Sequence, residues 1–459
     1  MRKRVVVATL FGLFALVIAS ATQHLAAAPP AATVRVPLTV PASMRSAPPF
    51  DVPRSLNVPP NFAISVFARV GGARFLAAAP NGDLLVSLPG ASKVVLLRPD
   101  DDDTPQQFDF ATGMSKPHDI VFHSYGGKPY VFIAAEDAIY RFAYTTGSTE
   151  AGARTTVVKD LPNGSNGELK GNYGHTLKNI AIDSQHKLYV SIASATNASP
   201  SDLAANPKRG AIYTYDATAS DQSATSGSLF AQGLRNAEGL AFVPATDDLW
   251  VVVNNRDQLR CPYDLTIPGT NATCKAGALD ARYVDNHPPE EFTRVRDGGN
   301  YGWPFCNPNP ESGMDDMPFD RDYENNKDGS KLNCDTADRI SKGIQAHSAP
   351  LSVTFTAGTN MPIFYRDGAI VGLHGSWNRT EKTGYKFVYF PWDAARDAPG
   401  EQQDLVSGWL ENGNAWGRPV DAAVAPDGAI FLSDDGAGAI YRLTYTGTIR
   451  TTWLPFVGD

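Results

Sequence analysis

Apolar and polar residues alternate with a period of two along much of this chain. In residues 173–194, YGHTLKNIAIDSQHKLYVSIAS, two alternating runs flank a polar turn, and His175 stands just ahead of the first run. Alternating runs rich in β-branched and aromatic residues and bounded by turn signals are typical of antiparallel hairpins rather than helices. The pattern therefore predicts an all-β protein.

The hairpin pattern recurs. Residues 74–100, RFLAAAPNGDLLVSLPGASKVVLLRPD, and residues 418–445, RPVDAAVAPDGAIFLSDDGAGAIYRLTY, both read as polar residue, strand, P-x-G turn, strand, polar loop and strand. Four weaker copies cover residues 116–144, 175–194, 235–257 and 347–379. Because a repeated supersecondary unit indicates a solenoid or propeller, six copies predict a six-bladed β-propeller of four-stranded antiparallel blades.

The chain ends are expected to close this propeller together. The last copy has three evident strands, and FAISVFARV, residues 62–70, precedes the first copy as an unpaired strand. We therefore predict that residues 62–70 complete the sixth blade. The predicted propeller covers residues 59–450 and is followed by a C-terminal tail, residues 451–459.

The N-terminus predicts export. A basic start, MRKR, precedes an apolar run and small residues, which indicates a signal peptide over residues 1–28, followed by a Pro-rich extended leader over residues 29–58. An uncleaved anchor is the alternative, although the run falls short of the ~20 residues that span a bilayer. We expect a secreted or periplasmic protein without a stable membrane span. Four N-x-S/T sequons, whose use depends on the host, start at Asn163, Asn197, Asn271 and Asn378.

All four cysteines fall in one segment that breaks the repeat. Residues 260–339 are rich in Pro, Asn, Asp and Gly, and we expect them to form a disulfide-stapled loop insertion. Export favours two disulfides, for which three pairings are possible; we favour the neighbours, Cys261 with Cys274 and Cys306 with Cys334. Zinc binding competes with this interpretation, but the segment has no CxxC pair.

Charge excludes one class of partner. The 459 residues carry a formal net charge of −8, and 42% are hydrophobic and 19% charged, as in a soluble globular protein. Without a basic field the chain has no electrostatic basis for binding nucleic acid.

Polar residues recur just before the first strand of each copy. In a propeller these positions meet at one mouth of the central channel, and the loops after the second strands join them. The positions hold Arg74, His118, His175, Arg235 with Asn236, His347 and Arg418, and the loop of the fifth copy adds His374. Three arginines and four histidines predict a locally basic mouth that binds an anionic ligand. Because positive neighbours keep an imidazole neutral, His175 is a candidate general base.

The same residues lie in motifs that resemble the soluble pyrroloquinoline quinone-dependent sugar dehydrogenases, most closely the sorbosone dehydrogenase branch. The resemblance runs from about residue 55 to residue 447. Its motifs are RFLAAAPNGDLLVS, GLRNAEGLAF, DGGNYGWP, QAHSAPL, LHGSWNRT and GRPVDAAVAPDG. It implies a six-bladed quinoprotein that oxidises a sugar or sugar aldehyde by hydride transfer to the quinone (PQQ), with calcium as a second cofactor.

The resemblance also implies roles for single residues. His175 takes the place of the general base, and Arg235 and Asn236 match the pair that faces the quinone carbonyls. Arg418 matches an arginine that holds a quinone carboxylate, and His374 stands where the glucose-oxidising branch has a lysine. With Arg74, His118 and His347 these form the predicted cofactor site, and calcium is expected on the backbone carbonyls of Asn255 and Arg256. Because the chain has no CxxCH haem motif, electrons are expected to leave to an external acceptor, a quinone or a cytochrome.

Two positions depart from that family. The loop that commonly reads N-E-R-D is Asn254-Asn255-Arg256-Asp257 here, and Ser194 replaces an acidic residue of the glucose-oxidising branch. Two other functions stay open on the same fold. A metal-dependent lactonase-like hydrolase would need a carboxylate-rich mouth, which the repeat positions do not supply. A non-catalytic binding propeller would use the cysteine-containing segment for recognition.

Overall fold

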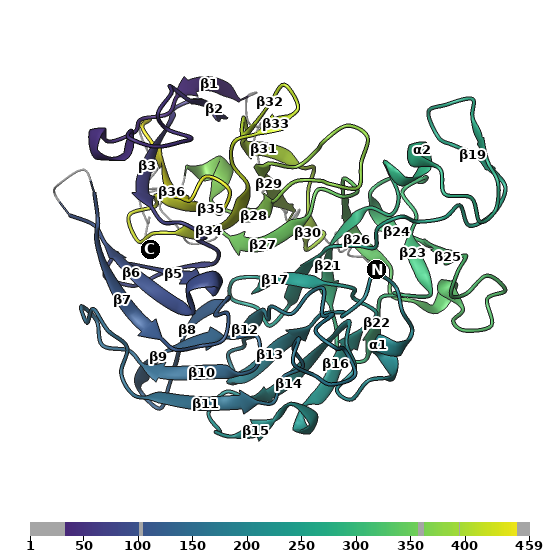
Figure 1. Cartoon of the computed structure of the whole chain (residues 1–459), viewed down its shortest axis with the longest axis horizontal. Helices are drawn as coiled ribbons and strands as arrows, with labels where there is room; N and C mark the ends of the chain where they lie inside the picture. Colours follow the sequence, from purple (N-terminus) through teal and green to yellow (C-terminus); the bar gives the residue numbers. More distant parts are fainter. Residues whose placement is uncertain (1–32, 101–103, 357–361, 394, 448–459) are drawn as a thin grey trace, which may run out of the picture.

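The computed structural model describes residues 33–100, 104–356, 362–393 and 395–447. Six twisted sheets stand around a central axis as the blades of a propeller, which confirms the predicted all-β fold (Figure 1). The predicted signal peptide and the predicted C-terminal tail lie outside the described residues. Among the described residues, no helix combines the length and the apolar composition needed to span a membrane.

Each blade begins with a strand at the axis and continues outward, and the first strands of successive blades contact one another in a closed ring. Blade one contains β4 (Leu76–Ala78), β5 (Leu84–Leu88), β6 (Lys93–Arg98) and β7 (Gln106–Thr112). Blade two contains β8 (Ile120–Tyr125), β9 (Lys128–Ala134), β10 (Ile139–Ala143), β11 (Arg154–Lys159) and β15 (Gln222–Ser223). Blade three contains β12 (Ile180–Ile182), β13 (Lys187–Ile192), β14 (Ala211–Asp216), β16 (Ser228–Gln232) and β22 (Gly299–Asn300).

The other three blades follow the same order from the axis outward. Blade four contains β17 (Ala237–Phe242), β18 (Leu249–Val253), β21 (Glu290–Val295), β26 (Ile340–Ile344) and β24 (Asp315–Met317). Blade five contains β27 (Pro350–Phe355), β28 (Gly368–Leu373), β29 (Lys386–Asp393) and β31 (Gln403–Val406), with β30 (Ala398–Pro399) beside β29. Blade six contains β34 (Pro419–Val424), β35 (Ile430–Asp434), β36 (Ala439–Tyr445) and β3 (Phe62–Arg69). Blades two, three, four and five thus exceed the four strands predicted.

The predicted closure of the ring is confirmed. Strand β3 pairs antiparallel with β36, from Phe62 opposite Tyr445 to Arg69 opposite Ala439, so the purple and yellow ends of the chain share one blade (Figure 1). The predicted leader is partly ordered into a two-stranded sheet of β1 (Val34–Pro37) and β2 (Ser55–Val58). It packs Phe50 and Leu56 into the core shared by blades five and six.

The P-x-G signals mark tight turns between inner hairpin strands. Gly82 has φ of +89° and Gly428 has φ of +83°, a backbone region that glycine enters without steric cost. Each glycine donates its N–H to a carbonyl three residues earlier, Ala79 and Ala425 respectively, at 2.9 Å. These turns lie at the end of the channel opposite the predicted site, because the site residues precede the inner strands.

The apolar core lies between blades. Six clusters of buried apolar residues each join two neighbouring blades, for example Val86 of blade one with Ile440 of blade six. Both faces of most blades are therefore buried, which explains strands such as β5 and β18 in which every residue is buried. Such packing holds the inner strands, and the residues that precede them, in fixed positions.

The cysteine-containing segment is not a single insertion. It supplies β21 as the third strand of blade four and adds β22 and β24 to the outer edges of blades three and four. The rest lies outside the ring of blades (Figure 1) and contains β19 (Leu265–Thr266), β20 (Thr273–Cys274), α2 (Ala281–Val284), β23 (Cys306–Pro308), β25 (Phe319–Arg321) and the 3₁₀ turn Cys334–Thr336. Disulfides join Cys261 to Cys274 and Cys306 to Cys334, as predicted.

The remaining elements are short. They are α1 (Ser201–Ala204), the pair β32 (Leu410–Glu411) and β33 (Asn414–Ala415), and the 3₁₀ turns Ala42–Met44, Pro89–Ala91, Ala224–Ser226 and Ile363–Tyr365.

Candidate active site

The predicted site residues gather at one mouth of the central channel. Seven of them stand just before inner strands, and His374 follows β28: Arg74, His118, His175, Arg235, Asn236, His347 and Arg418, with His374. They differ in exposure. His175, Arg74, His374 and Arg418 are partly exposed, whereas His118, Arg235, Asn236 and His347 are buried. The first four are therefore the ones that a ligand at the mouth would meet directly.

His175 is held in one tautomer. Its Nδ1 lies 2.8 Å from the carbonyl oxygen of Ser194, and a carbonyl can only accept, so Nδ1 carries the proton and Nε2 the lone pair. Burial, together with the positive charge of Arg235, lowers the pKa of His175 to about 4. The imidazole is thus neutral at pH 7, and Nε2 can accept a proton.

Arg235, Asn197 and Asp257 form what we call the Arg235 cluster. The Arg235 guanidinium donates from Nε to the Asn197 carbonyl at 3.0 Å, from Nη1 to the Asn254 carbonyl at 3.2 Å, and from Nη2 to the Asn197 side-chain oxygen at 3.1 Å. Nη2 also pairs with Asp257 at 3.2 Å. These contacts use four of the five N–H groups of a guanidinium and leave one on Nη1 for another acceptor.

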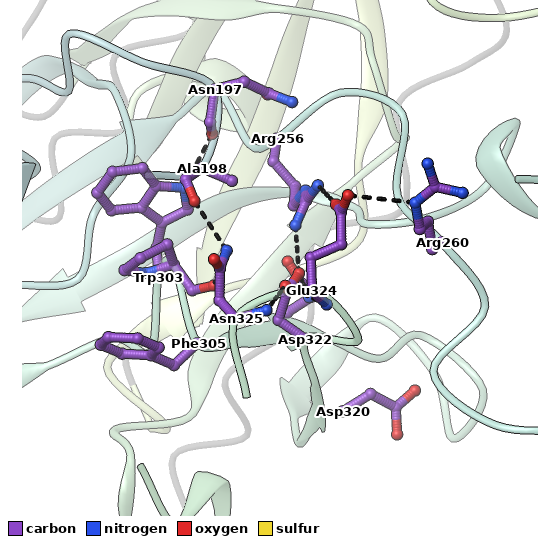
Figure 2. A network of polar contacts seen from close by, with 12 residues as sticks. Asn197, Ala198, Arg256, Arg260, Trp303, Phe305, Asp320, Asp322, Glu324 and Asn325 are labelled. Carbon is purple, nitrogen blue, oxygen red and sulfur yellow. Dashed lines mark hydrogen bonds and ion pairs between the residues drawn. The ribbon is translucent and has the colours of Figure 1, made fainter. Parts of the chain in front are cut away.

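Asn197 holds this cluster together. Its side-chain oxygen also accepts the N–H of Asp257 at 2.8 Å, and its Nδ2 donates to the Asp257 carbonyl at 2.9 Å. Its own carbonyl accepts the indole N–H of Trp303 at 3.1 Å, and Asn325 donates to the neighbouring Ala198 carbonyl at 2.7 Å (Figure 2). The cysteine-containing segment therefore fixes the loop that positions Arg235.

His347 contacts the carboxylate oxygen of Asp257 that does not pair with Arg235. Its Nδ1 lies 3.6 Å from an Asp257 oxygen and its Nε2 lies 2.8 Å from the Val284 carbonyl. Burial lowers the pKa of His347, but Asp257 and the buried Glu290 outweigh it and raise the pKa above its ordinary value. Burial raises the pKa of Asp257, but His347 and Arg235 lower it overall. Both pKa shifts favour the charged forms, so His347 and Asp257 stabilise each other's charge.

The predicted calcium loop is anchored by its side chains. Asn255 donates from Nδ2 to Glu291 at 2.8 Å and from its main chain to Glu290 at 2.6 Å. Arg256 pairs with Asp322 and, at 2.6 Å, with Glu324, both in the cysteine-containing segment (Figure 2). Within the described part of the chain, no donor reaches the carbonyl oxygens of Asn255 and Arg256. These two oxygens are available to a hard cation.

Among the described residues, side chains alone do not form a metal site at the channel mouth. In the part of the chain that the structure describes, no group of three or more His, Cys, Asp or Glu side chains is arranged to hold a metal ion. A cation at this mouth would therefore depend on main-chain oxygens and on the oxygens of its ligand.

Arg74, Asp435, His374 and Arg418 form the Arg74 cluster on the other side of the mouth. Asp435 accepts from Arg74 Nη1 at 2.9 Å and contacts His374 Nε2 at 2.8 Å. Although burial opposes its ionisation, His374 and Arg74 lower the pKa of Asp435 to about 2. Among the described residues, the guanidinium of Arg418 makes only long bonds, at 3.3 and 3.4 Å, to the carbonyls of His374 and Gly375. The N–H groups of Arg418 are therefore only weakly hydrogen-bonded within this cluster.

Between the two clusters lies a buried polar group that is incompletely bonded. Glu238 accepts from Asn236 at 3.0 Å, while its second oxygen lies 3.7 Å from His118 and 3.9 Å from Arg74 without a hydrogen bond. Neither ring nitrogen of His118 nor Nε of Arg74 has a hydrogen-bond partner among the described residues. Buried polar atoms are normally paired, so these atoms are exceptions among the described residues.

The predicted basic mouth is corrected in one respect. Asp257, Asp435 and Glu238 stand among the cations, so the mouth contains a charged carboxylate for most of its arginines. The repeat positions themselves hold no carboxylate. Glu238 lies inside RNAEG, two residues after Asn236, and the two aspartates follow second strands.

The family can now be stated. The model of the TrAA12-like family matches residues 57–446. The chain belongs to this family. The pyranose dehydrogenase PQQ domain from Coprinopsis cinerea, in its holo form, has the same fold, with a TM-score of 0.68 and 21% identity over 85% of this chain and 97% of that chain. A calcium structure of Trichoderma reesei Carbohydrate-Active Enzymes Family AA12 is similar, with a TM-score of 0.67, 19% identity and the same coverage.

A curated relative of this TrAA12-like chain is an uncharacterized protein of Borreliella burgdorferi, 26% identical over 275 residues, or 59% of this chain. The match spans 61% of the length of that relative. The resemblance to quinone-dependent sugar dehydrogenases is thus matched at the level of fold and family, and the sorbosone branch stays a prediction.

Sequence reasoning missed three residues of the TrAA12-like site that share one signal. Asn197, Asp257 and Asp435 all lie in loops after second strands, β13, β18 and β35. That loop position was used to predict His374 but not applied to every copy, and Asn197 was noted only as a sequon. Glu238 was missed because the motif around it was assigned to Arg235 and Asn236 alone.

Proposed function

We propose that this chain is an exported oxidoreductase that oxidises a sugar or sugar aldehyde with pyrroloquinoline quinone as its cofactor. Family membership and the shared fold with a holo PQQ domain support the proposal. The observation that carries it is His175, a neutral imidazole with a fixed tautomer at the mouth where the cations converge. A lactonase-like hydrolase is the alternative on the same fold.

The residues present fit the cofactor. The quinone is anionic, and Arg74 and Arg418 offer guanidinium donors that the protein does not saturate. Arg235 keeps one N–H that could bond a carbonyl oxygen, and Asn255 and Arg256 offer main-chain oxygens to calcium. When bound, the quinone would accept a hydride from the sugar carbon.

The protein's own part is to move one proton and to stabilise one charge. His175 Nε2 would accept the proton of the sugar hydroxyl, while the Nδ1 bond to Ser194 keeps the ring oriented. Arg235, fixed by Asn197, would stabilise negative charge that develops on an oxygen facing it. Electrons would then pass to an external quinone or cytochrome. By its resemblance to the sorbosone branch, we propose a sugar aldehyde or aldose as the substrate.

The test combines binding with turnover. His175→Gln and His175→Ala should bind the quinone, followed by absorbance, but reduce dye about 10²–10⁴-fold more slowly than the wild type, the usual contribution of a general base. His186→Gln is the matched control, because His186 lies at the other end of the same hairpin and contacts His123 rather than the mouth. The wild-type rate should be steady near neutral pH and fall below about pH 5, as His175, with a pKa of about 4, becomes protonated.

The outcomes separate the alternatives. A His175 variant that binds quinone and keeps the wild-type rate would exclude His175 as the base. A wild type that binds no quinone with calcium present would overturn the proposal and leave the binding propeller.

A further inference from the structure

A second hollow opens beside the channel mouth. It has a volume of about 410 Å³ and lies between the β28–β29 loop and the cysteine-containing segment, with Trp377, Arg379 and Thr380 on one wall and Gln258, Leu279 and Asp285 on the other. We call it the Trp377 pocket.

Its lining combines two exposed apolar side chains with polar groups. Trp377 is 71% exposed and Leu279 is 51% exposed, and these are the two most exposed large apolar side chains in the part of the chain that the structure describes. Single exposed apolar residues are common, but two that face one hollow from separate segments indicate a binding surface. Amide, carboxylate and hydroxyl groups of Gln258, Asp285 and Thr380 surround them.

The indole is presented by a fixed loop. Ser376, its neighbour, donates its N–H to the Thr383 carbonyl at 2.9 Å and accepts the Tyr385 hydroxyl on its own carbonyl at 2.9 Å. Gly375, with φ of +111°, packs so closely on the Tyr385 ring that an added Cβ would lie 2.4 Å from it. Because the main chain of this loop is already fixed, a ligand that covers the indole costs little main-chain entropy.

The two walls are also tied together. Thr380 donates its N–H to the Asp285 carboxylate at 2.7 Å, and Arg379 donates to the Asp285 carbonyl. The pocket is therefore a formed site, with its width set by contacts between blade five and the cysteine-containing segment.

The pocket adjoins the candidate active site through shared chain. Gln258 follows Asp257 of the Arg235 cluster, and the carbonyl of Val284, another lining residue, holds His347. Trp377 follows the segment whose carbonyls, at His374 and Gly375, accept from Arg418. These shared segments place the pocket next to the loops that form the mouth.

We propose that the Trp377 pocket is a subsite for the next units of an oligosaccharide whose terminal sugar is oxidised at the mouth. A sugar ring has an apolar face that can cover an indole and hydroxyls that can bond the surrounding polar groups, which suits this mixed lining. The inference rests on the proposed function for the position of the terminal unit. It adds a preference for chains over single sugars.

The test begins without the cofactor. Titration calorimetry of the cofactor-free protein with gluco- and xylo-oligosaccharides of one to five units should show affinity rising with length. Trp377→Ala should weaken binding of the longer chains about tenfold, equivalent to about 1.4 kcal/mol, and leave single sugars unchanged. Trp377→Phe should retain most of the affinity, because it keeps an aromatic face.

Two further variants keep the test decisive. Leu279→Ser changes the opposite wall of the pocket and should also weaken the binding of the longer oligosaccharides. It keeps the test valid if Trp377→Ala misfolds. Tyr263→Ala removes a 45% exposed aromatic from a different hollow of the cysteine-containing segment and should have no effect. On the quinone-loaded enzyme, Trp377→Ala should raise KM for the longer chains only.

The possible results separate this inference from the proposed function. Length-dependent binding that requires Trp377, without quinone-dependent oxidation, would leave the subsite standing and remove the function. Oxidation with equal KM for short and long sugars in both wild type and Trp377→Ala would overturn the subsite alone. The subsite would also be overturned if no saccharide bound to the protein. Slower electron transfer from Trp377→Ala to a protein acceptor would, in that case, assign the pocket to the acceptor.

Discussion

The two sides of the channel mouth hold their arginines in different ways. In the Arg235 cluster, every nitrogen of the buried guanidinium is bonded, to Asn197, Asn254 and Asp257. In the Arg74 cluster, Arg74 has one good ion pair and a buried Nε without a partner among the described residues, while the guanidinium of Arg418 makes only long bonds to described residues.

This difference in hydrogen bonding indicates that the two clusters have different functions. A guanidinium whose three nitrogens are all held by the protein is preorganised, so its charge stays in place while a reaction develops charge beside it. Donors that the protein leaves unsatisfied gain most from an anionic ligand, because pairing them relieves the cost of buried polar atoms. We therefore expect the Arg235 cluster to act on reaction rate and the Arg74 cluster to act on ligand affinity.

Breaking the Arg235 cluster should have the larger effect. Asn197→Ala removes the acceptor shared by Arg235 and Asp257 and the donor to the Asp257 carbonyl, which leaves buried polar groups unpaired. We expect a loss of about 2–3 kcal/mol in the free energy of unfolding, measured in urea, and about a tenfold slower rate.

Asn271→Ala is the matched control for this prediction, since Asn271 also begins a sequon but is exposed in the cysteine-containing segment. Wild-type stability in Asn197→Ala would mean that the loop is held by the Trp303 and Asn325 bonds to main-chain oxygens alone.

Variants of the Arg74 cluster should change the affinity for the quinone. Removing the charge of Arg74 should weaken binding, and removing that of Asp435 should strengthen it. Arg74→Gln removes a donor facing an anionic ligand and should weaken quinone binding about tenfold, or about 1.4 kcal/mol, in equilibrium absorbance titrations. Asp435→Asn removes the carboxylate that competes for the same guanidinium and should strengthen binding by a smaller factor. Asp427→Asn, in the exposed pair with Arg442 on the same blade, should change nothing. Weaker binding in both cluster variants would show that the ion pair shapes the mouth rather than competing with the ligand.

How far the sequence predicts this molecule depends on what each pattern encodes. Alternation and the P-x-G turns specify strands and hairpins, so the propeller, the β3–β36 closure and both disulfides could be predicted. Strand β21 could not, because it lies between Pro-Pro and Gly-Gly inside a loop-like composition. In the site, positions before inner strands were predictable from the repeat.

The partners of those site residues were harder to predict. Asp257 and Asp435 are acidic residues in polar loops, where most carboxylates are merely solvated, and only the fold brings them against Arg235 and Arg74. The burial of His118 under Phe75, with ring centroids 4.4 Å apart, likewise depends on packing between blades that no local pattern encodes.

Two carboxyl groups, those of Asp421 and Asp119, are buried in the channel beneath both clusters. The titration of Asp421 can be compared with that of Asp435, which is paired with Arg74 and His374. Asp421 accepts the N–H of Leu76 at 2.8 Å, and burial, with the nearby charge of Asp119 as a further cause, raises the pKa of Asp421 to about 7. Its ordinary pKa is 3.8, so between about pH 4 and pH 7 the folded state binds a proton that the unfolded state has released. Stability from this group should therefore fall as pH rises through that window, unlike that from Asp435, whose lowered pKa favours the folded state above pH 4.

Asp421→Asn keeps an oxygen that can accept the Leu76 N–H but cannot ionise. Relative to the wild type, it should gain at least about 1 kcal/mol of unfolding free energy between pH 5 and pH 8, measured by urea denaturation at several pH values. Asp109→Asn, at the exposed pair with Lys93, should leave the pH dependence unchanged. Parallel curves for Asp421→Asn and the wild type would mean that the channel hydrates or pairs this carboxylate.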